Sequence, residues 1–129
     1  LKMKEKVYVK TEQAPSPLGA YSQAVKVANW LFISGQLPLN PSTGELISKD
    51  VAEQAKQTFE NLKAILKAAG MELKNIVKIT LYIRNFEEFP IINKVYEEYF
   101  KEVLPARSTV QAFPPKNAAL EVDAIAFNF

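Results

Sequence analysis

The segment from Asp50 to Ala69 constrains the fold most, because one apolar stripe runs along its whole length. Asp50 suits the N-cap position, Glu53 follows at capping-box spacing, and Gly70 is an expected C-terminal stop. The stripe has the three-four spacing of one helix face and consists of Ala52, Ala55, Phe59, Leu62, Leu66 and Ala69. The segment therefore predicts a long amphipathic helix that needs a partner surface.

The next segment, Ile76 to Ile83, alternates in polarity and predicts a half-buried strand. Val77, Ile79, Leu81 and Ile83 would face one way, with Lys78, Thr80 and Tyr82 facing the other. A second helix is expected from about Phe89 to Val103, because Pro90 is tolerated in a first turn and Pro105 marks an end. Its apolar set includes Ile92, Val95, Tyr96, Tyr99 and Phe100.

Five further short segments predict strands, and the loop from Asn40 to Gly44 has strong turn chemistry. The strands are Val7–Val9, Ala24–Val27, Leu31–Ser34 (after a turn at Ala28-Asn29), Ser108–Ala112 and Leu120–Phe127. The order β-β-β-α-β-α-β-β predicts an α+β domain over residues 1–129, with one mixed sheet and two helices on one face. The other face carries amphipathic residues such as Tyr8, Thr80 and Tyr82, which suggests a subunit interface.

Composition limits the chemistry that the chain can perform. Among its 129 residues there is no cysteine and no histidine, which excludes disulfides, thiol nucleophiles and imidazole bases and argues against a zinc site. The net charge of +2 is too balanced to indicate a nucleic-acid binder. No stretch has the length of a membrane span, and the polar N-terminus from Leu1 to Lys6 has no apolar secretory core. We therefore expect a cytoplasmic protein.

Three segments together resemble the reactive intermediate deaminase (Rid, or YjgF) family, in particular its RidA branch. The resemblance covers essentially the whole chain in order, and Pro105-Ala106-Arg107-Ser108 is its most telling part. The three segments are Ala14-Pro15 with Leu18–Ala24, Ile33–Pro38 with Pro41–Glu45, and Leu104–Val110 with Leu120–Ala126.

The resemblance implies a chorismate-mutase-like fold and a homotrimer whose sheets line a central barrel, with ligand clefts between neighbouring subunits. It also implies a 2-iminobutanoate/2-iminopropanoate deaminase, which hydrolyses reactive enamines and imines, such as those from 2-aminoacrylate, to 2-oxoacids and ammonia. No metal and no cofactor are implied, and neither a nucleic acid nor a membrane is expected as a partner.

Arg107 and Glu121 are the first candidates for catalytic roles. A planar guanidinium holds a carboxylate through two parallel hydrogen bonds, and the matching family arginine binds the substrate carboxylate. A strand carboxylate beside apolar neighbours has a raised pKa, and the matching glutamate orients the attacking water. We expect the two groups to share one bound molecule and its water. The alternatives are a surface arginine or salt bridge and an exposed glutamate. Asp123, on the same strand face, is assigned no catalytic role.

The resemblance adds five further residues to the candidate site. It places Tyr21, the third catalytic candidate, in the cleft across the subunit boundary, although tyrosines are more often packing residues. Ser34 and Gly35 would bring backbone close to the substrate, and Asn93 would hydrogen-bond in the cleft. Thr109 stands where many relatives carry cysteine, so its backbone amide, and no thiol, would contact the carboxylate.

Other functions fit the same sequence. The cleft could bind 2-oxoacids or other small carboxylates as a regulatory module. Some family members are described as endoribonucleases or translation inhibitors, but no basic-aromatic stripe is visible here. A chaperone-like role has no sequence signature. The sequence does not identify the physiological imine.

Overall fold

The computed structural model describes residues 5–129 of the chain. Residues 1–4, which contribute to the expectation that no secretory signal is present, lie outside the described residues. Within residues 5–129, no helix is long and apolar enough to cross a membrane.

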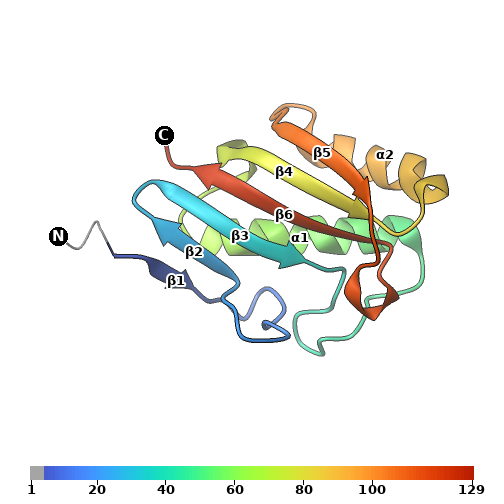
Figure 1. Cartoon of the computed structure of the whole chain (residues 1–129), viewed down its shortest axis with the longest axis horizontal. Helices are drawn as coiled ribbons and strands as arrows, with labels where there is room; N and C mark the ends of the chain where they lie inside the picture. Colours follow the sequence, from blue (N-terminus) through green and yellow to red (C-terminus); the bar gives the residue numbers. More distant parts are fainter. Residues whose placement is uncertain (1–4) are drawn as a thin grey trace.

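Six strands form one mixed sheet in the order β1-β2-β3-β6-β4-β5 (Figure 1). Only β4 and β5, which are joined through a helix, run parallel among the described strand pairs. The strands are β1 (Val7–Val9), β2 (Ala24–Val27), β3 (Trp30–Gln36), β4 (Ile76–Ile83), β5 (Ala106–Gln111) and β6 (Leu120–Phe127). The predicted element order and α+β class are confirmed, with β3 longer than expected and β5 starting two residues earlier.

The first helix, α1, runs from Val51 to Ala68, as its stripe predicts. The Asp50 carboxylate accepts a hydrogen bond from the Glu53 amide at 2.9 Å and caps the helix. At the other end Gly70 has φ of 75°, a conformation that glycine adopts without steric cost. The helix ends are therefore set by the residues that the sequence pattern identifies.

The second helix, α2, spans Phe89 to Phe100, and its predicted end at Val103 is wrong. The amides of Val103 and Leu104 both bond to the Phe100 carbonyl, and Leu104 has φ of 50°. The chain thus leaves the helix before Pro105. Three single 3₁₀ turns complete the fold: η2 (Leu73–Asn75), η3 (Phe86–Glu88) and η4 (Pro115–Asn117).

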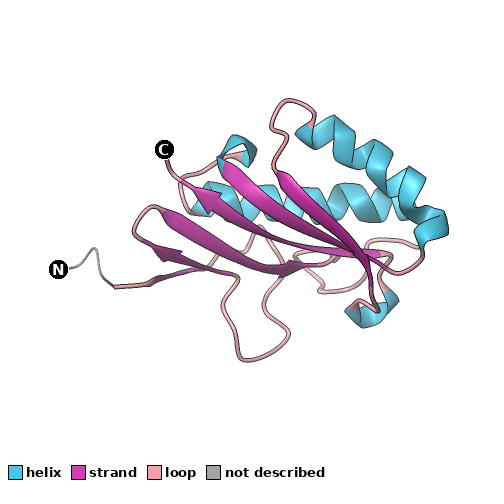
Figure 2. Ribbon diagram, turned by 45° about the horizontal axis from the view of Figure 1, so that its top comes forward, coloured by secondary structure: helices cyan, strands magenta, loops and turns pink. Residues whose placement is uncertain are grey.

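Both helices cover the same face of the sheet, and the core lies between them and the strands (Figure 2). From β6, the side chains of Leu120, Val122, Ala124 and Ala126 are buried in this layer. On β4, Ile76 is buried and Val77 only partly so, because the register against β6 shifts between Ile76 and Lys78. The prediction that Val77 faces the core is therefore wrong, because the bulge places Ile76 there instead.

The opposite face of the sheet is covered by no helix among the described residues (Figure 2). Five large apolar side chains of this open face are more than a third exposed: Tyr8, Val27, Trp30, Phe32 and Val110. Most of them lie on the adjacent strands β1, β2 and β3, and exposed apolar side chains gathered in this way are typical of an interaction site.

Candidate functional site

Four of the seven predicted site residues line one cavity beside β3 and β6. Tyr21, Ser34, Gly35 and Glu121 surround a volume of ≈ 480 Å³, which we call the Glu121 pocket. Its other lining residues are Leu18, Gly19, Leu37 and Pro115, which the sequence analysis did not select. The pocket is therefore largely apolar around a single carboxyl group.

Local backbone features place the Glu121 carboxyl in this pocket. The register of β3 against β6 shifts between Ile33 and Gln36, next to Gly35. A Cβ atom at Gly35 would lie only 2.9 Å from the Glu121 Cδ atom. The absence of a side chain at position 35 thus leaves room for the carboxyl.

The loop that carries Tyr21 is tied to β3 by hydrogen bonds. The Ser34 hydroxyl donates to the Ser22 carbonyl at 2.6 Å, and the Ser34 amide donates to the Gln23 carbonyl at 3.0 Å. The Tyr21 hydroxyl accepts from the Leu18 amide at 3.0 Å. Gln23 is buried, and its side-chain amide bonds to the backbone of residues 11–15, which fixes the rest of this loop.

Glu121 has a perturbed acidity. Burial raises the pKa of its carboxyl above the usual range, and the negative charge of Asp123 raises it further. The pKa of Tyr82, which lies opposite Glu121 on β4, is also raised, first by its hydrogen bond to Asp123 and then by burial. A carboxyl with a raised pKa is a better proton acceptor than an ordinary exposed carboxylate.

Arg107 lies elsewhere, at the start of β5, where it is exposed and contacts side chains of α2. Its Nη1 donates to Asn93 Oδ1 at 2.8 Å. Its Cζ lies 4.7 Å from the ring centroid of Tyr96 and 5.6 Å from that of Phe89. Cation–π contacts and one hydrogen bond thus orient the guanidinium.

The stacking partners of Arg107 were missed by the sequence analysis, which placed Tyr96 only in the apolar stripe of α2. The available signal was spacing, because Phe89, Asn93 and Tyr96 lie four and three positions apart on one helix face.

Within one chain, Arg107 and Glu121 lie on opposite faces of the sheet. Arg107 is in register with Ile79, which faces the helices, and Glu121 is in register with Tyr82, which faces the open side. Thr109 pairs with the buried Leu81 and so shares the side of Arg107. The structure therefore groups Arg107, Asn93 and Thr109 apart from the Glu121 pocket, and a single chain does not bring the two groups around one molecule.

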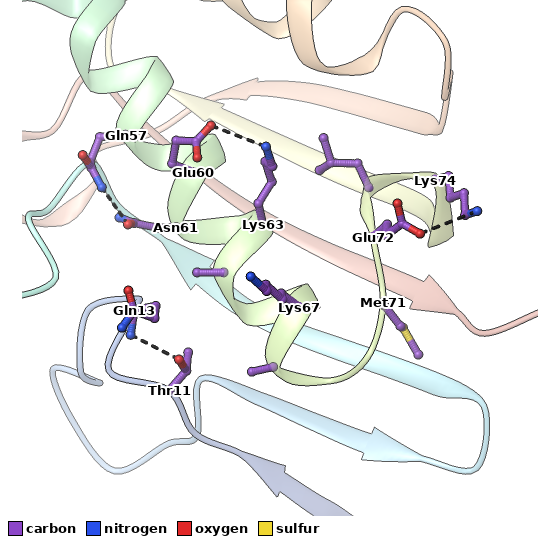
Figure 3. Close-up of a pocket in the computed structure, with 13 residues that line it drawn as sticks. Thr11, Gln13, Gln57, Glu60, Asn61, Lys63, Lys67, Met71, Glu72 and Lys74 are labelled. Atoms are coloured by element: carbon purple, nitrogen blue, oxygen red, sulfur yellow. Dashed lines mark hydrogen bonds and ion pairs between the residues drawn. The ribbon is translucent and has the colours of Figure 1, made fainter.

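A cavity larger than the Glu121 pocket is lined by none of the predicted site residues. It is a groove of ≈ 1150 Å³ between α1, η2 and the loop near Thr11 (Figure 3). Its rim carries the exposed ion pairs Lys63–Glu60 at 3.8 Å and Lys74–Glu72 at 3.6 Å. Such exposed pairs are weak, and the groove offers no chemistry comparable with that of the Glu121 pocket.

The fold defines a small α+β protein with one mixed sheet that helices cover on one face. Its candidate residues form two groups, one around Arg107 and one around Glu121. A family model described as endoribonuclease L-PSP matches residues 11–128. A RutC family protein of Pyrococcus horikoshii is 47% identical over 126 residues, which cover 97% of this chain and 98% of the relative. A 2-iminobutanoate/2-iminopropanoate deaminase of Dermatophagoides farinae is 44% identical over 124 residues, covering 95% and 97%.

A solved structure of Escherichia coli TdcF with bound serine superimposes with a TM-score of 0.90 at 40% identity, covering 95% of this chain and 99% of that one. The chain therefore belongs to the endoribonuclease L-PSP family, which confirms the resemblance to the Rid/YjgF proteins.

Proposed function

We propose that this protein is a cytoplasmic deaminase that hydrolyses 2-imino and 2-enamino acids, such as 2-iminobutanoate and 2-iminopropanoate, to 2-oxoacids and ammonia without a cofactor. The observation that carries the proposal is the half-buried Glu121 carboxyl, whose pKa is raised inside a small, largely apolar pocket. The deaminase name of a relative that is 44% identical supports the same reaction.

The two parts of the site would be supplied by neighbouring subunits. Because Arg107 and Glu121 face opposite sides of one sheet, a substrate that contacts both needs a second copy of the chain. The open sheet face with its exposed Phe32 and Trp30 supports self-association. We propose a homotrimer, in which each cleft joins Arg107, Asn93 and Thr109 of one subunit to the Glu121 pocket of the next.

Arg107 would bind the substrate carboxylate through two parallel hydrogen bonds, with the Thr109 amide as a further donor. Asn93, by accepting one guanidinium N–H, would fix the plane in which the others point. Tyr21 and Gly35 would close the cleft around the reacting carbon. Binding of this kind fixes the distance and the angle between the imine and a water molecule.

Glu121 would carry the proton transfers. It takes a proton from the water as the water oxygen bonds to the carbon of the protonated imine, which gives a carbinolamine. It then returns this proton to the nitrogen and accepts the hydroxyl proton as the C–N bond breaks. The products are the 2-oxoacid and ammonia, which leaves as ammonium after taking the proton from Glu121. One acid–base group is typically worth about 10²–10⁴-fold, which suffices for a reaction that water already performs.

The first test generates 2-aminoacrylate with a dehydratase and follows pyruvate formation. Arg107→Ala should abolish the acceleration, whereas Lys94→Ala, an exposed change on the same helix as Asn93, should not. An Arg107→Ala protein with the rate of the native protein would refute the role of Arg107.

A second test asks whether the site is shared between subunits. Arg107→Ala and Glu121→Gln subunits, each inactive alone, are refolded together at equal amounts. With head-to-tail contacts, random mixing should restore about one quarter of the native activity. A cleft works only when its Arg107 comes from a Glu121→Gln subunit and its Glu121 comes from an Arg107→Ala subunit. No recovery would contradict a site shared in this way.

A regulatory protein that binds 2-oxoacids or other small carboxylates is the second candidate, and the bound serine in the TdcF structure favours it, because serine carries a carboxylate. Steady-state ammonia release separates the two functions, since a sensor would saturate without forming product.

A further inference from the structure

Two rows of polar side chains cross the open face of the sheet beside the Glu121 pocket. In one row Tyr82 of β4 is in register with Glu121 of β6, and in the next Thr80 is in register with Asp123. The Tyr82 hydroxyl nevertheless donates diagonally to Asp123 Oδ2, at 2.9 Å. One phenol thus lies beside two carboxylates and donates its proton to only one of them.

We propose that Asp123 and Tyr82 are positioning residues that assign the acid–base role to Glu121: the Tyr82 hydroxyl holds the Asp123 carboxylate in place, and its negative charge lets Glu121 hold and release the catalytic proton. The inference rests on the proposed deaminase function for the use of that proton, and on the geometry of β4 and β6 for the coupling.

The coupling follows from spacing on one strand. Residues two positions apart on a strand point to the same face about 7 Å apart, so Glu121 and Asp123 repel each other when both are ionised. The Tyr82 hydroxyl donates only to Asp123, so it fixes the position of that carboxylate relative to Glu121. The nearby Asp123 charge raises the pKa of Glu121 and makes Glu121 the proton acceptor of the pair.

Other titratable and charged groups lie near Glu121 and Asp123, but none of them takes the place of the hydrogen bond from Tyr82 to Asp123. The Lys78 ammonium on β4 donates a hydrogen bond to the Thr80 hydroxyl at 3.1 Å, and Thr80 is in register with Asp123. Tyr21 lines the pocket from the loop before β2, and the adjacent β3 residues Ser34 and Gly35 carry no charge. The hydrogen bond to Asp123 raises the pKa of Tyr82, so the phenol stays a donor over the assay range.

The test measures the titration of the carboxyls directly, by ¹³C NMR of side-chain carboxyls in the intact oligomer. Asp123→Asn keeps an acceptor for Tyr82 and removes only the charge. It should lower the titration midpoint of Glu121 by a few tenths of a unit to about one pH unit. Asp123→Glu restores the charge and should return the midpoint towards the native value. Glu45→Gln, which removes a carboxylate from an exposed loop, is the matched control and should change nothing.

The pH profile of kcat/KM for imine hydrolysis is the second readout. Its acidic limb should move to lower pH in Asp123→Asn by the same amount as the NMR midpoint. Tyr82→Phe, which removes the hydrogen bond that holds the Asp123 carboxylate, should move the Glu121 midpoint in the same direction by a smaller amount.

An unchanged Glu121 midpoint in Asp123→Asn would overturn the inference, as would a shifted midpoint with an unshifted acidic limb in an active enzyme. A native protein without deaminase activity would reject the proposed function, while the NMR titration would still decide whether Asp123 and Tyr82 control Glu121.

Discussion

The Glu121 carboxyl occupies the space that a side chain at position 35 would need. A Cβ atom built on Gly35 would fall against the Glu121 carboxyl, with its Cδ at 2.9 Å. The carboxyl could relieve such a contact only by leaving its present position. Gly35 is therefore required by the placement of Glu121, in addition to any contact that its backbone makes with substrate.

Gly35→Ala is accordingly expected to displace Glu121 and to lower imine hydrolysis by roughly 10²-fold or more, the usual contribution of an acid–base group. Gly19→Ala is the control from the same pocket, because its added methyl group would meet the Tyr21 ring at an ordinary contact distance of 3.6 Å. The measurement is kcat/KM in the 2-aminoacrylate assay. Equal activities of the two variants would show that the position of Glu121 does not matter.

Asn93 is expected to contribute through Arg107. Asn93→Ala removes the acceptor at 2.8 Å and leaves the guanidinium held mainly by Tyr96 and Phe89. The KM should rise by roughly tenfold with little change in kcat, since hydrogen bonds to charged groups are worth about 1.5–3 kcal/mol and this one is exposed in the isolated chain.

Asn93→Asp sharpens this test, because a carboxylate at position 93 would compete with the substrate for Arg107. Its KM should rise further than that of Asn93→Ala, and the excess should shrink as salt is added. A salt-independent KM, or a loss confined to kcat in both variants, would argue that Asn93 acts in another way.

The helices and the faces of β4 and β6 could be predicted because each follows from the spacing of apolar residues within its own segment. The stripe containing Phe59 and Leu62 and the alternation around Glu121 are independent of which strands become neighbours. The end of α2 and the bulge at Ile76 could not be predicted, because they depend on backbone geometry and on the register with another strand.

The arrangement of the candidate site was only partly predictable, for a related reason. That Arg107 lies on the helix side follows from its register with Ile79, which no periodicity within Ala106–Gln111 indicates. The contact between Tyr82 and Asp123 joins residues 41 positions apart, so the sequence alone gave Asp123 no role.

The raised pKa of Glu121 predicts a cost in stability. A carboxyl whose pKa is higher in the folded than in the unfolded state binds more protons when folded, so stability falls as pH rises through the folded-state pKa. The extra proton binding of the folded state stabilises it, and below the unfolded-state pKa this stabilisation is fully present. At neutral pH the native protein carries a partly buried charge that glutamine would not carry.

Glu121→Gln should therefore be inactive yet more stable than the native protein at neutral pH, with a gain that disappears on acidification. Thermal unfolding of both proteins between pH 4 and 8, with Glu45→Gln as the control for an exposed carboxyl, provides the measurement. A Glu121→Gln protein that is less stable at pH 7, or a difference independent of pH, would contradict the assigned environment of Glu121.

Phe59 in the core and Phe113 on the surface allow the effect of burial on stability to be compared for the same side chain. Phe59 of α1 is fully buried and packs against the rings of Tyr96, Tyr99 and Phe100, with centroids 5.9, 5.3 and 5.6 Å away. Phe59→Ala should lower the free energy of unfolding by about 3–5 kcal/mol, because it removes this contact area and leaves a cavity.

Because Tyr96 also contacts Arg107, the loss of Phe59 should leave the guanidinium less firmly oriented. The KM of the folded Phe59→Ala protein should therefore be raised. Phe113→Ala removes the same atoms from a side chain that is 95% exposed and should change the unfolding free energy by no more than about 0.5 kcal/mol. Urea unfolding and KM measured on both variants test the two effects together. A Phe59→Ala protein with lower stability and an unchanged KM would show that Arg107 is held independently of the aromatic cluster behind it.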